Sequence, residues 1–160
     1  MFPATTNVVG VLSEGIVEFA LDDMRCGIDL DATQEVLRAV AVRPVEGQPP
    51  FIAGVIDLRG TIVPVIDLRV RFGRTSRALD ADDHFVIAKA HRRPIALWVD
   101  KVLGIIPASS AGIRSIEGLI VGTRSLRGVT RTTGGIVLVH DVAGFISEAE
   151  LDALEHAQHQ

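Results

Sequence analysis

The sequence is poor in cysteine and aromatic residues: among 160 residues it has one cysteine, one tryptophan and no tyrosine. The single thiol, Cys26, excludes an internal disulfide and fits a reducing compartment. Because free cysteines are usually buried, we expect Cys26 to be a small apolar residue on a buried strand. The shortage of aromatic rings removes the stacking surfaces on which single-stranded nucleic acids bind.

A basic excess and long apolar runs are also missing. The formal net charge of −4 argues against a general affinity for phosphate backbones. No uncharged apolar stretch reaches the roughly 18 residues that a transmembrane helix needs, and residues 1–13 lack the basic start and apolar centre of a signal peptide. We therefore expect a soluble, cytoplasmic protein that reaches a membrane only through a partner.

Motifs for catalysis and for ligand binding are absent too. The sequence has no Gly-x-Ser-x-Gly, no Gly-rich phosphate loop and no metal spacing among its five histidines. Asp57 and Asp67 could form a carboxylate pair, but each stands at the same place in a repeated run, which favours hydrogen bonding at strand ends and turns. The sequence thus predicts neither an enzyme nor a cofactor or metal site.

Residues 51–73 are the most informative stretch that is present. Two Val-Ile-Asp-Leu-Arg runs flank Gly60-Thr61. The β-branched residues and the Gly-x step predict a hairpin with Gly60 at the first central position of a type II′ turn.

This turn sets the predicted pairing of the two strands. With Gly60-Thr61 as the loop, Leu58 pairs with Val63 and Ile56 with Val65, which makes one face wholly apolar and part of a core. The opposite face would carry Val55, Asp57, Arg59, Ile62, Pro64 and Ile66. Its mixture of charged and apolar residues suits a partner surface or a seam between subdomains.

The rest of the chain predicts short strands with minor helix. We expect strands at residues 14–20, 24–30, 35–43, 84–90, 95–99, 102–107, 117–121 and 126–132, with another from residue 134. Asp31 is predicted to cap one helical turn over residues 32–34, and Ser147 to cap a short helix over residues 148–157. Residues 74–83, with their acidic end, and the basic tip at residues 91–94 are expected to be solvated. This pattern is typical of an all-β domain of small barrels or a sandwich, with residues 14–157 as one domain after a flexible leader of residues 1–13.

The pattern of residues 60–68 recurs at residues 134–142: glycine, Ile-Val, a spacer, Val, a spacer, Asp and a branched residue. This echo suggests two like halves, although nine matching positions in a β-rich chain could also arise by chance.

Gly54-Val-Ile-Asp-Leu-Arg-Gly60, Pro64-Val-Ile-Asp-Leu68 and Arg71-Phe-Gly73 closely resemble the CheW family of chemotaxis coupling proteins. The similarity runs from about Gly15 to about Asp152. Like residues also occur at positions 27–30, 34–36, 51–54, 99–102 and 135–142. The resemblance implies two small five-stranded β-barrels around a shared hydrophobic core, in agreement with the two halves inferred from the echo.

The resemblance also implies a function: a non-catalytic adaptor that joins the cytoplasmic tip of chemoreceptors to the regulatory domain of the histidine kinase CheA. In the family a glutamate and an arginine face one another in the groove that receives the receptor tip, and they map to Glu35 and Arg59. The predicted protein-binding residues also include Val36 and the motif glycines Gly54 and Gly60. For these glycines, backbone geometry alone is at least as good an explanation as contact.

Two alternatives stay open. A coupling protein of a pili or other non-flagellar chemosensory pathway would have the same sequence features. A small-barrel nucleic-acid binder is much less favoured, because it needs a basic groove with stacking aromatics.

Overall fold

The computed structural model describes residues 15–107, 112–115 and 125–158. Its strands are β1 (Gly15–Leu21), β2 (Met24–Asp29), β3 (Thr33–Arg38), β4 (Ile52–Leu58), β5 (Thr61–Asp67), β6 (His84–Ala90), β7 (Arg93–Val99), β8 (Lys101–Pro107), β9 (Arg114–Ser115), β10 (Leu126–Thr132) and β11 (Gly135–His140). Its helices are η1 (Leu30–Ala32), α1 (Leu68–Arg71), η2 (Val142–Gly144) and α2 (Glu148–Gln158). No helix in this described part is long and apolar enough to cross a membrane. The predicted leader and the strand predicted at residues 117–121 lie outside the described residues.

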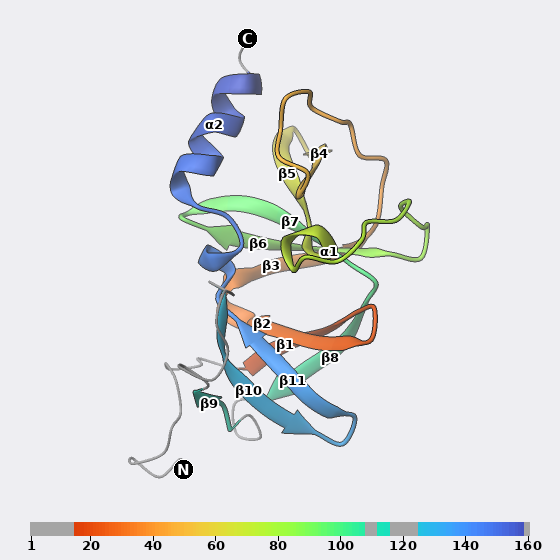
Figure 1. Ribbon diagram of the computed structural model, residues 1–160, viewed down its shortest axis with the longest axis vertical. Coiled ribbons are helices and arrows are strands. Elements are labelled where there is room, and N and C mark those ends of the chain that lie inside the picture. The colour runs from red at the N-terminus through yellow and green to blue at the C-terminus, as the bar shows by residue number, and fades with distance from the viewer. Residues whose placement is uncertain (1–14, 108–111, 116–124, 159–160) are drawn as a thin grey trace.

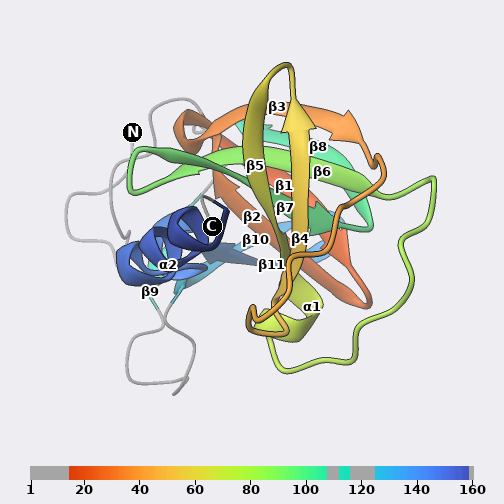
Figure 2. The ribbon, with the colours of Figure 1, turned by 90° about the horizontal axis from the view of Figure 1, so that it is seen from above.

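Two sheets lie one above the other, with α2 beside the upper one (Figures 1 and 2). The lower sheet has the order β8-β1-β2-β11-β10-β9 and the upper sheet β3-β6-β7-β5-β4. Each contains two antiparallel hairpins joined by one parallel pair, β2 with β11 and β5 with β7. The mostly β architecture is as predicted, and this matching strand order agrees with two like halves. The two-residue β9 adds a sixth strand to the lower sheet, and neither sheet is hydrogen-bonded into a closed barrel within the described ranges.

Alternate residues of each sheet serve different cores. In β6, Phe85 packs into a cluster inside the upper half, whereas Val86 belongs to a larger cluster that both sheets share. Phe19 of β1 and Leu97 of β7 meet in this shared core. Side chains of a strand alternate between its two faces. One face of the curled upper sheet therefore packs inside the upper half, and the other face packs against the lower sheet. The predicted shared core is confirmed.

The β4–β5 hairpin forms, but its predicted register was wrong. Leu58 pairs with Thr61, so the two-residue turn is Arg59-Gly60. Arg59 and Gly60 have φ of 50° and 89°. Positive φ at both positions is the mark of a type I′ turn, whose twist matches that of the flanking strands. Glycine therefore takes the second central position, and the backbone N–H of Gly60 donates to Asp57 Oδ1 at 2.7 Å.

The corrected register moves each partner by two residues and leaves the faces as predicted. Ile56 now pairs with Val63, and both are buried in the upper core. On the other face Ile62 is 48% exposed, whereas Pro64 and Ile66 are buried. The mixed face is thus open only near the turn.

Two further local predictions are wrong. The cap of η1 is Asp29 rather than Asp31, and its side chain accepts a hydrogen bond from the Asp31 N–H. Asp83, at the end of the loop expected to be solvated, is buried and accepts hydrogen bonds from Arg77 and from Trp98 Nε1. Burial by itself would raise the pKa of Asp83, but these hydrogen bonds outweigh it and lower the pKa to about 2.

The C-terminal helix is confirmed, with its predicted cap. Ser147 Oγ accepts from the Glu150 N–H at 3.0 Å, and Glu150 Oε1 accepts from the Ser147 N–H at 2.8 Å. This reciprocal arrangement is a capping box. The turn at residues 91–94, expected to be solvated, instead contacts the segment that leads into α2. His91 Nε2 lies within hydrogen-bond distance, 2.8 Å, of the Ile146 carbonyl oxygen.

Cys26 is fully buried, as predicted, and burial raises the pKa of its thiol to about 12. Of the buried charged residues, Arg69 of α1 is the most enclosed, with 1% of its side chain exposed. It forms ion pairs with Asp22, in the β1–β2 turn, and with Asp100, between β7 and β8. These contacts join the lower sheet to the upper one.

Candidate functional site

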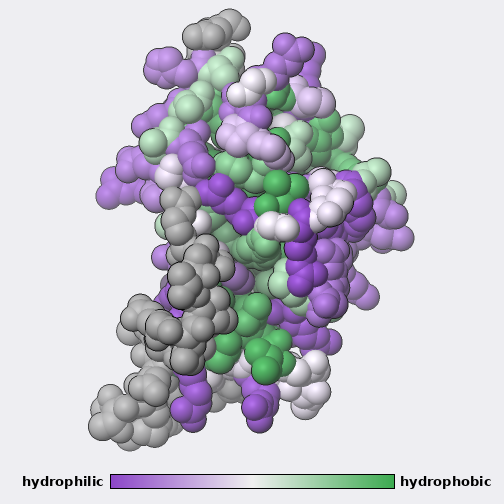
Figure 3. Space-filling model, in the orientation of Figure 1, coloured by the Kyte–Doolittle hydropathy of each residue, from purple (hydrophilic) through white to green (hydrophobic). Residues whose placement is uncertain are grey.

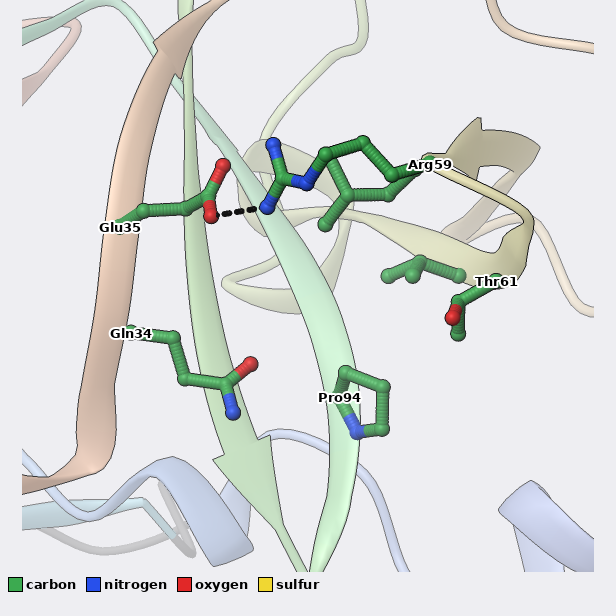
Figure 4. A pocket seen from close by; sticks show the side chains of 7 residues that line it. Gln34, Glu35, Arg59, Thr61 and Pro94 are labelled. Atoms are coloured by element: carbon green, nitrogen blue, oxygen red, sulfur yellow. Dashed lines mark hydrogen bonds and ion pairs between the residues drawn. The ribbon is translucent and has the colours of Figure 1, made fainter.

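A groove of about 400 Å³ lies on the upper half (Figure 4). It is formed by β3, by the β4–β5 hairpin and by the start of β7, which are far apart in the sequence. Its lining residues are Gln34, Glu35, Leu58, Arg59, Thr61, Val63 and Pro94. Leu58, Val63 and Pro94 supply the apolar part, while the remaining side chains are polar or charged.

Glu35 and Arg59 point toward one another across the groove and form an ion pair between Glu35 Oε2 and Arg59 Nη2 (Figure 4). Their side chains are 34% and 70% exposed. The hydrogen bond to Glu35, together with the negative charge of its carboxylate, raises the pKa of the Arg59 guanidinium above its usual value. Both side chains remain accessible to a partner.

This ion pair also bridges the two edges of the upper sheet. Glu35 lies on β3 and Arg59 directly follows β4, and these are the first and last strands of the sheet order. The sheet thus curls until its edges approach. The ion pair spans the gap near the turn, and the backbone of Arg43, five residues beyond β3, forms a single bridge with Val55 of β4. The barrel-like shape expected from the resemblance is present in this sense.

The chemistry of the groove suits recognition of a protein surface. An apolar floor with a few fixed polar groups can bury part of a partner and set its orientation. Among the described residues no group of three or more His, Cys, Asp and Glu is placed to hold a metal ion. Asp57 and Asp67 are both structural: Asp57 accepts from the Gly60 N–H, and Asp67 accepts from the Arg69 N–H.

Val36 is adjacent to Glu35 but lies on the opposite face of β3. It pairs with Val86 of the shared core, whereas Glu35 pairs with Ile87 of the upper core. Val36 is 40% exposed and does not line the groove. The structure therefore brings Glu35, Arg59 and Gly60 together and leaves Val36 outside this group.

Gly54 is also outside the groove, against the backbone of Arg43. A Cβ on Gly54 would lie 2.2 Å from the Arg43 carbonyl oxygen. Arg43 exchanges two backbone hydrogen bonds with Val55, of 2.9 and 2.8 Å. The glycine is therefore required for the close approach of these two chain segments, which is the backbone explanation considered for it above.

We expect Gly54→Ala to destabilise the protein much more than Gly60→Ala. A methyl group at Gly54 must displace Arg43 as well as adopt a φ of 149°, a loss of about 3 kcal/mol or more. A Cβ at Gly60 meets nothing within 4 Å, so only the cost of positive φ remains, about 1 kcal/mol. Urea unfolding of both variants measures the difference, and equal losses would contradict this account of Gly54.

Of the lining residues, the sequence predicted Glu35 and Arg59 as site residues and missed the others, which are Gln34, Leu58, Thr61, Val63 and Pro94. Thr61 was placed in the turn, and Pro94 in a solvated tip, whereas Pro94 lies in β7 opposite Lys89. The parallel pairing of β5 with β7 brings Pro94 near the hairpin, to which Thr61 itself belongs. No local pattern indicates this pairing, because the two strands are separated by α1, a long loop and β6.

Comparison with known proteins identifies relatives along most of the chain. A family model described as CheW-like domain matches residues 15–150. The chemotaxis protein CheW of Treponema pallidum (strain Nichols) is 28% identical over 145 residues, which cover 87% of this chain and 85% of that protein. Protein FrzA of Myxococcus xanthus is 42% identical over 98 residues, which cover 61% of this chain and 56% of FrzA.

A solved structure has the same fold. The scaffolding protein TtCheW from Thermoanaerobacter tengcongensis superposes with a TM-score of 0.75 at 29% sequence identity, covering 84% of this chain and 92% of that one. Together with the match of the family model over nearly all the described residues, this similarity shows that the chain belongs to the CheW-like domain family.

Proposed function

We propose that the chain is an adaptor without catalytic activity that couples chemoreceptors to the histidine kinase CheA. Membership of the CheW-like family and the similarity to a scaffolding protein support a coupling role in chemotaxis. The observation that carries the proposal is the ion pair of Glu35 and Arg59 across an open groove.

In this proposal the groove receives the cytoplasmic tip of a receptor. A helical tip presents apolar side chains to the floor at Leu58, Val63 and Pro94, while Glu35 and Arg59 fix its register. Gly60 acts through the turn that carries Arg59. Val36 and Gly54, which complete the predicted set, lie outside the groove, so Val36 would contact a different part of a partner and Gly54 would act through the backbone.

The kinase contact belongs elsewhere on the surface, because one adaptor must hold both partners at the same time. The protein would then work in the cytoplasm, held at membrane-associated receptor arrays by its partners.

A second candidate of the same class is a coupling protein of a non-flagellar chemosensory pathway. The similarity to protein FrzA, at 42% identity over 98 residues, supports this second candidate. It shares the adaptor mechanism and differs in the receptor and kinase that are bound.

The proposal is tested by capture from cytoplasmic lysate of the source organism, with the tagged full chain as bait. We expect to recover a histidine kinase of the CheA type, whose sequence tells which pathway it serves. The purified kinase and a receptor signalling fragment are then mixed with the chain. Phosphorylation of the kinase should rise above that seen with the receptor fragment alone or with the chain alone. A kinase that neither binds the chain nor responds to it would contradict the proposal.

A further inference from the structure

Arg59 has a backbone conformation that most residues avoid. Its φ is 50°, in the left-handed region where Cβ crowds the following carbonyl group and where glycine and asparagine are preferred. A turn selected for stability alone would have Asn-Gly at these two positions. Such strained residues concentrate at binding sites. Here the strained residue carries the guanidinium that meets Glu35.

Other turns of the chain show how such strain is held. Asp22 and His91 also have positive φ, of 54° and 51°. The Asp22 N–H donates to Asp100 Oδ2 at 2.7 Å, and His91 Nε2 lies 2.8 Å from the Ile146 carbonyl oxygen. In both turns a side-chain hydrogen bond attaches the strained residue to the body of the molecule.

The turn at Arg59 has the hydrogen bond of the Arg59 side chain to Glu35 on β3, and in addition its backbone is held from within its own hairpin. Asp57 Oδ1 accepts the Gly60 N–H at 2.7 Å, three residues along the chain. Asp57 is exposed and pairs with Ile62, and it does not line the groove. The ion pair of Arg59 is with Glu35, across the groove from the turn. Asp57 therefore acts on the backbone of the turn without entering the site.

We propose that Asp57 is a positioning residue of the groove: its hydrogen bond to Gly60 fixes the turn that directs Arg59 at Glu35. The inference rests on the proposed function of the Glu35 and Arg59 pair. It makes Asp57 contribute to partner affinity although Asp57 lies outside the groove. The required property is a hydrogen-bond acceptor at this position, not a negative charge.

The test compares Asp57→Ala, Asp57→Asn, Arg59→Ala and the double variant Asp57→Ala with Arg59→Ala. Affinity for a receptor signalling fragment is measured by calorimetry. Loss of one orienting hydrogen bond should weaken binding about fivefold in Asp57→Ala. Asp57→Asn should bind like the wild type, because an amide oxygen accepts the same bond. In the Arg59→Ala background, Asp57→Ala should have no further effect, since its target is gone.

Nuclear magnetic resonance supplies a readout independent of any partner. Asp57→Ala should speed hydrogen exchange of the Gly60 amide and shift the Arg59 Nε–H resonance, while Asp57→Asn should do neither. Unchanged spectra in Asp57→Ala would overturn the positioning role. An equal loss of affinity with and without Arg59, or an Asp57→Asn variant as weak as Asp57→Ala, would overturn it as well.

The proposed function of the ion pair and the positioning role of Asp57 can fail separately. If Arg59→Ala binds the receptor fragment like the wild type, the proposed function of the ion pair is wrong. A displaced Arg59 resonance in Asp57→Ala would still support the positioning role in that case. If Arg59→Ala loses affinity while Asp57→Ala keeps it in full, the proposed function stands and the inference about Asp57 is wrong.

Discussion

Replacing Arg59 by alanine should abolish receptor control of kinase activity and leave the melting temperature nearly unchanged. The Arg59 side chain is 70% exposed, so its pair with Glu35 contributes little to folding in water. On binding, both charges would be partly desolvated, and truncation of one then leaves the other without its partner. We expect receptor affinity to fall at least about thirtyfold. Thermal melts and receptor-dependent kinase phosphorylation measure the two effects on the same preparations.

Two further variants separate the role of Arg59 from a general loss of charge. Arg38→Ala removes an arginine whose side chain is 75% exposed and 3.9 Å from Asp82, and coupling should persist. The swap of Glu35→Arg with Arg59→Glu should restore part of the coupling if the two residues mainly orient each other, and none if Arg59 contacts the receptor. An Arg59→Ala variant that unfolds, or that couples like the wild type, would show that this pair is not the functional site.

The substitution Arg69→Met should cause the largest loss of stability among the charged residues, about 3–5 kcal/mol. Arg69 is 1% exposed, and its Nε donates to Asp22 Oδ1 at 3.1 Å. It is also paired with Asp100, and its guanidinium lies 5.5 Å from the centre of the Trp98 ring. Methionine keeps the length of the side chain but removes the enclosed cation between Asp22 and Asp100, which then keep only the more exposed Arg74 and Arg77 as partners.

For a domain of this size such a loss should lower the melting temperature by about 6 to 20 °C. Arg38→Met is the matched control, since an exposed arginine should change stability by no more than about 0.5 kcal/mol. Chemical denaturation is measured at low and at high salt. The loss of stability in Arg69→Met should depend little on salt, because a buried ion pair is screened less than a surface pair. If both variants unfold at the same denaturant concentration, Arg69 does not connect the two halves as described.

Exposure varies widely among the residues of the molecule. Figure 3 shows polar and apolar residues intermixed on one face, with apolar surface also present over the lower half. Large apolar residues such as Ile105 and Ile136 are 58% and 59% exposed. Charged residues vary in the same way: Arg38 is 75% exposed and Arg69 1% exposed. This exposure decides how much an ion pair contributes to the free energy of unfolding.

Features that depend on near neighbours in the chain could be predicted from the sequence. A hairpin within residues 51–73, the N-cap at Ser147 and the burial of Cys26 are all present as expected. Each follows from periodicity, turn chemistry or side-chain polarity within a few residues. The pairing of Glu35 with Arg59 was implied by family resemblance and by no local pattern.

Turn register and capping were predicted less well, since neighbouring residues compete for the same role. Gly60 tolerates either central position of a two-residue turn, and the Asp57 hydrogen bond selects the second. Asp29 and Asp31 can both cap a short helix, and the end of β2 selects Asp29. These choices differ by small free energies that a sequence pattern does not resolve.

Only the tertiary structure decided where the groove lies and which charges are enclosed. The groove forms where β3, the β4–β5 turn and β7 lie side by side. They do so because the upper sheet curls and because β5 pairs in parallel with β7, which comes much later in the chain. Asp83 and Arg69 are buried by the same long-range packing. The alternation of apolar and polar residues determines which face of a strand is buried, but it does not determine which strand is its neighbour. The partners of these side chains are therefore set by the fold as a whole.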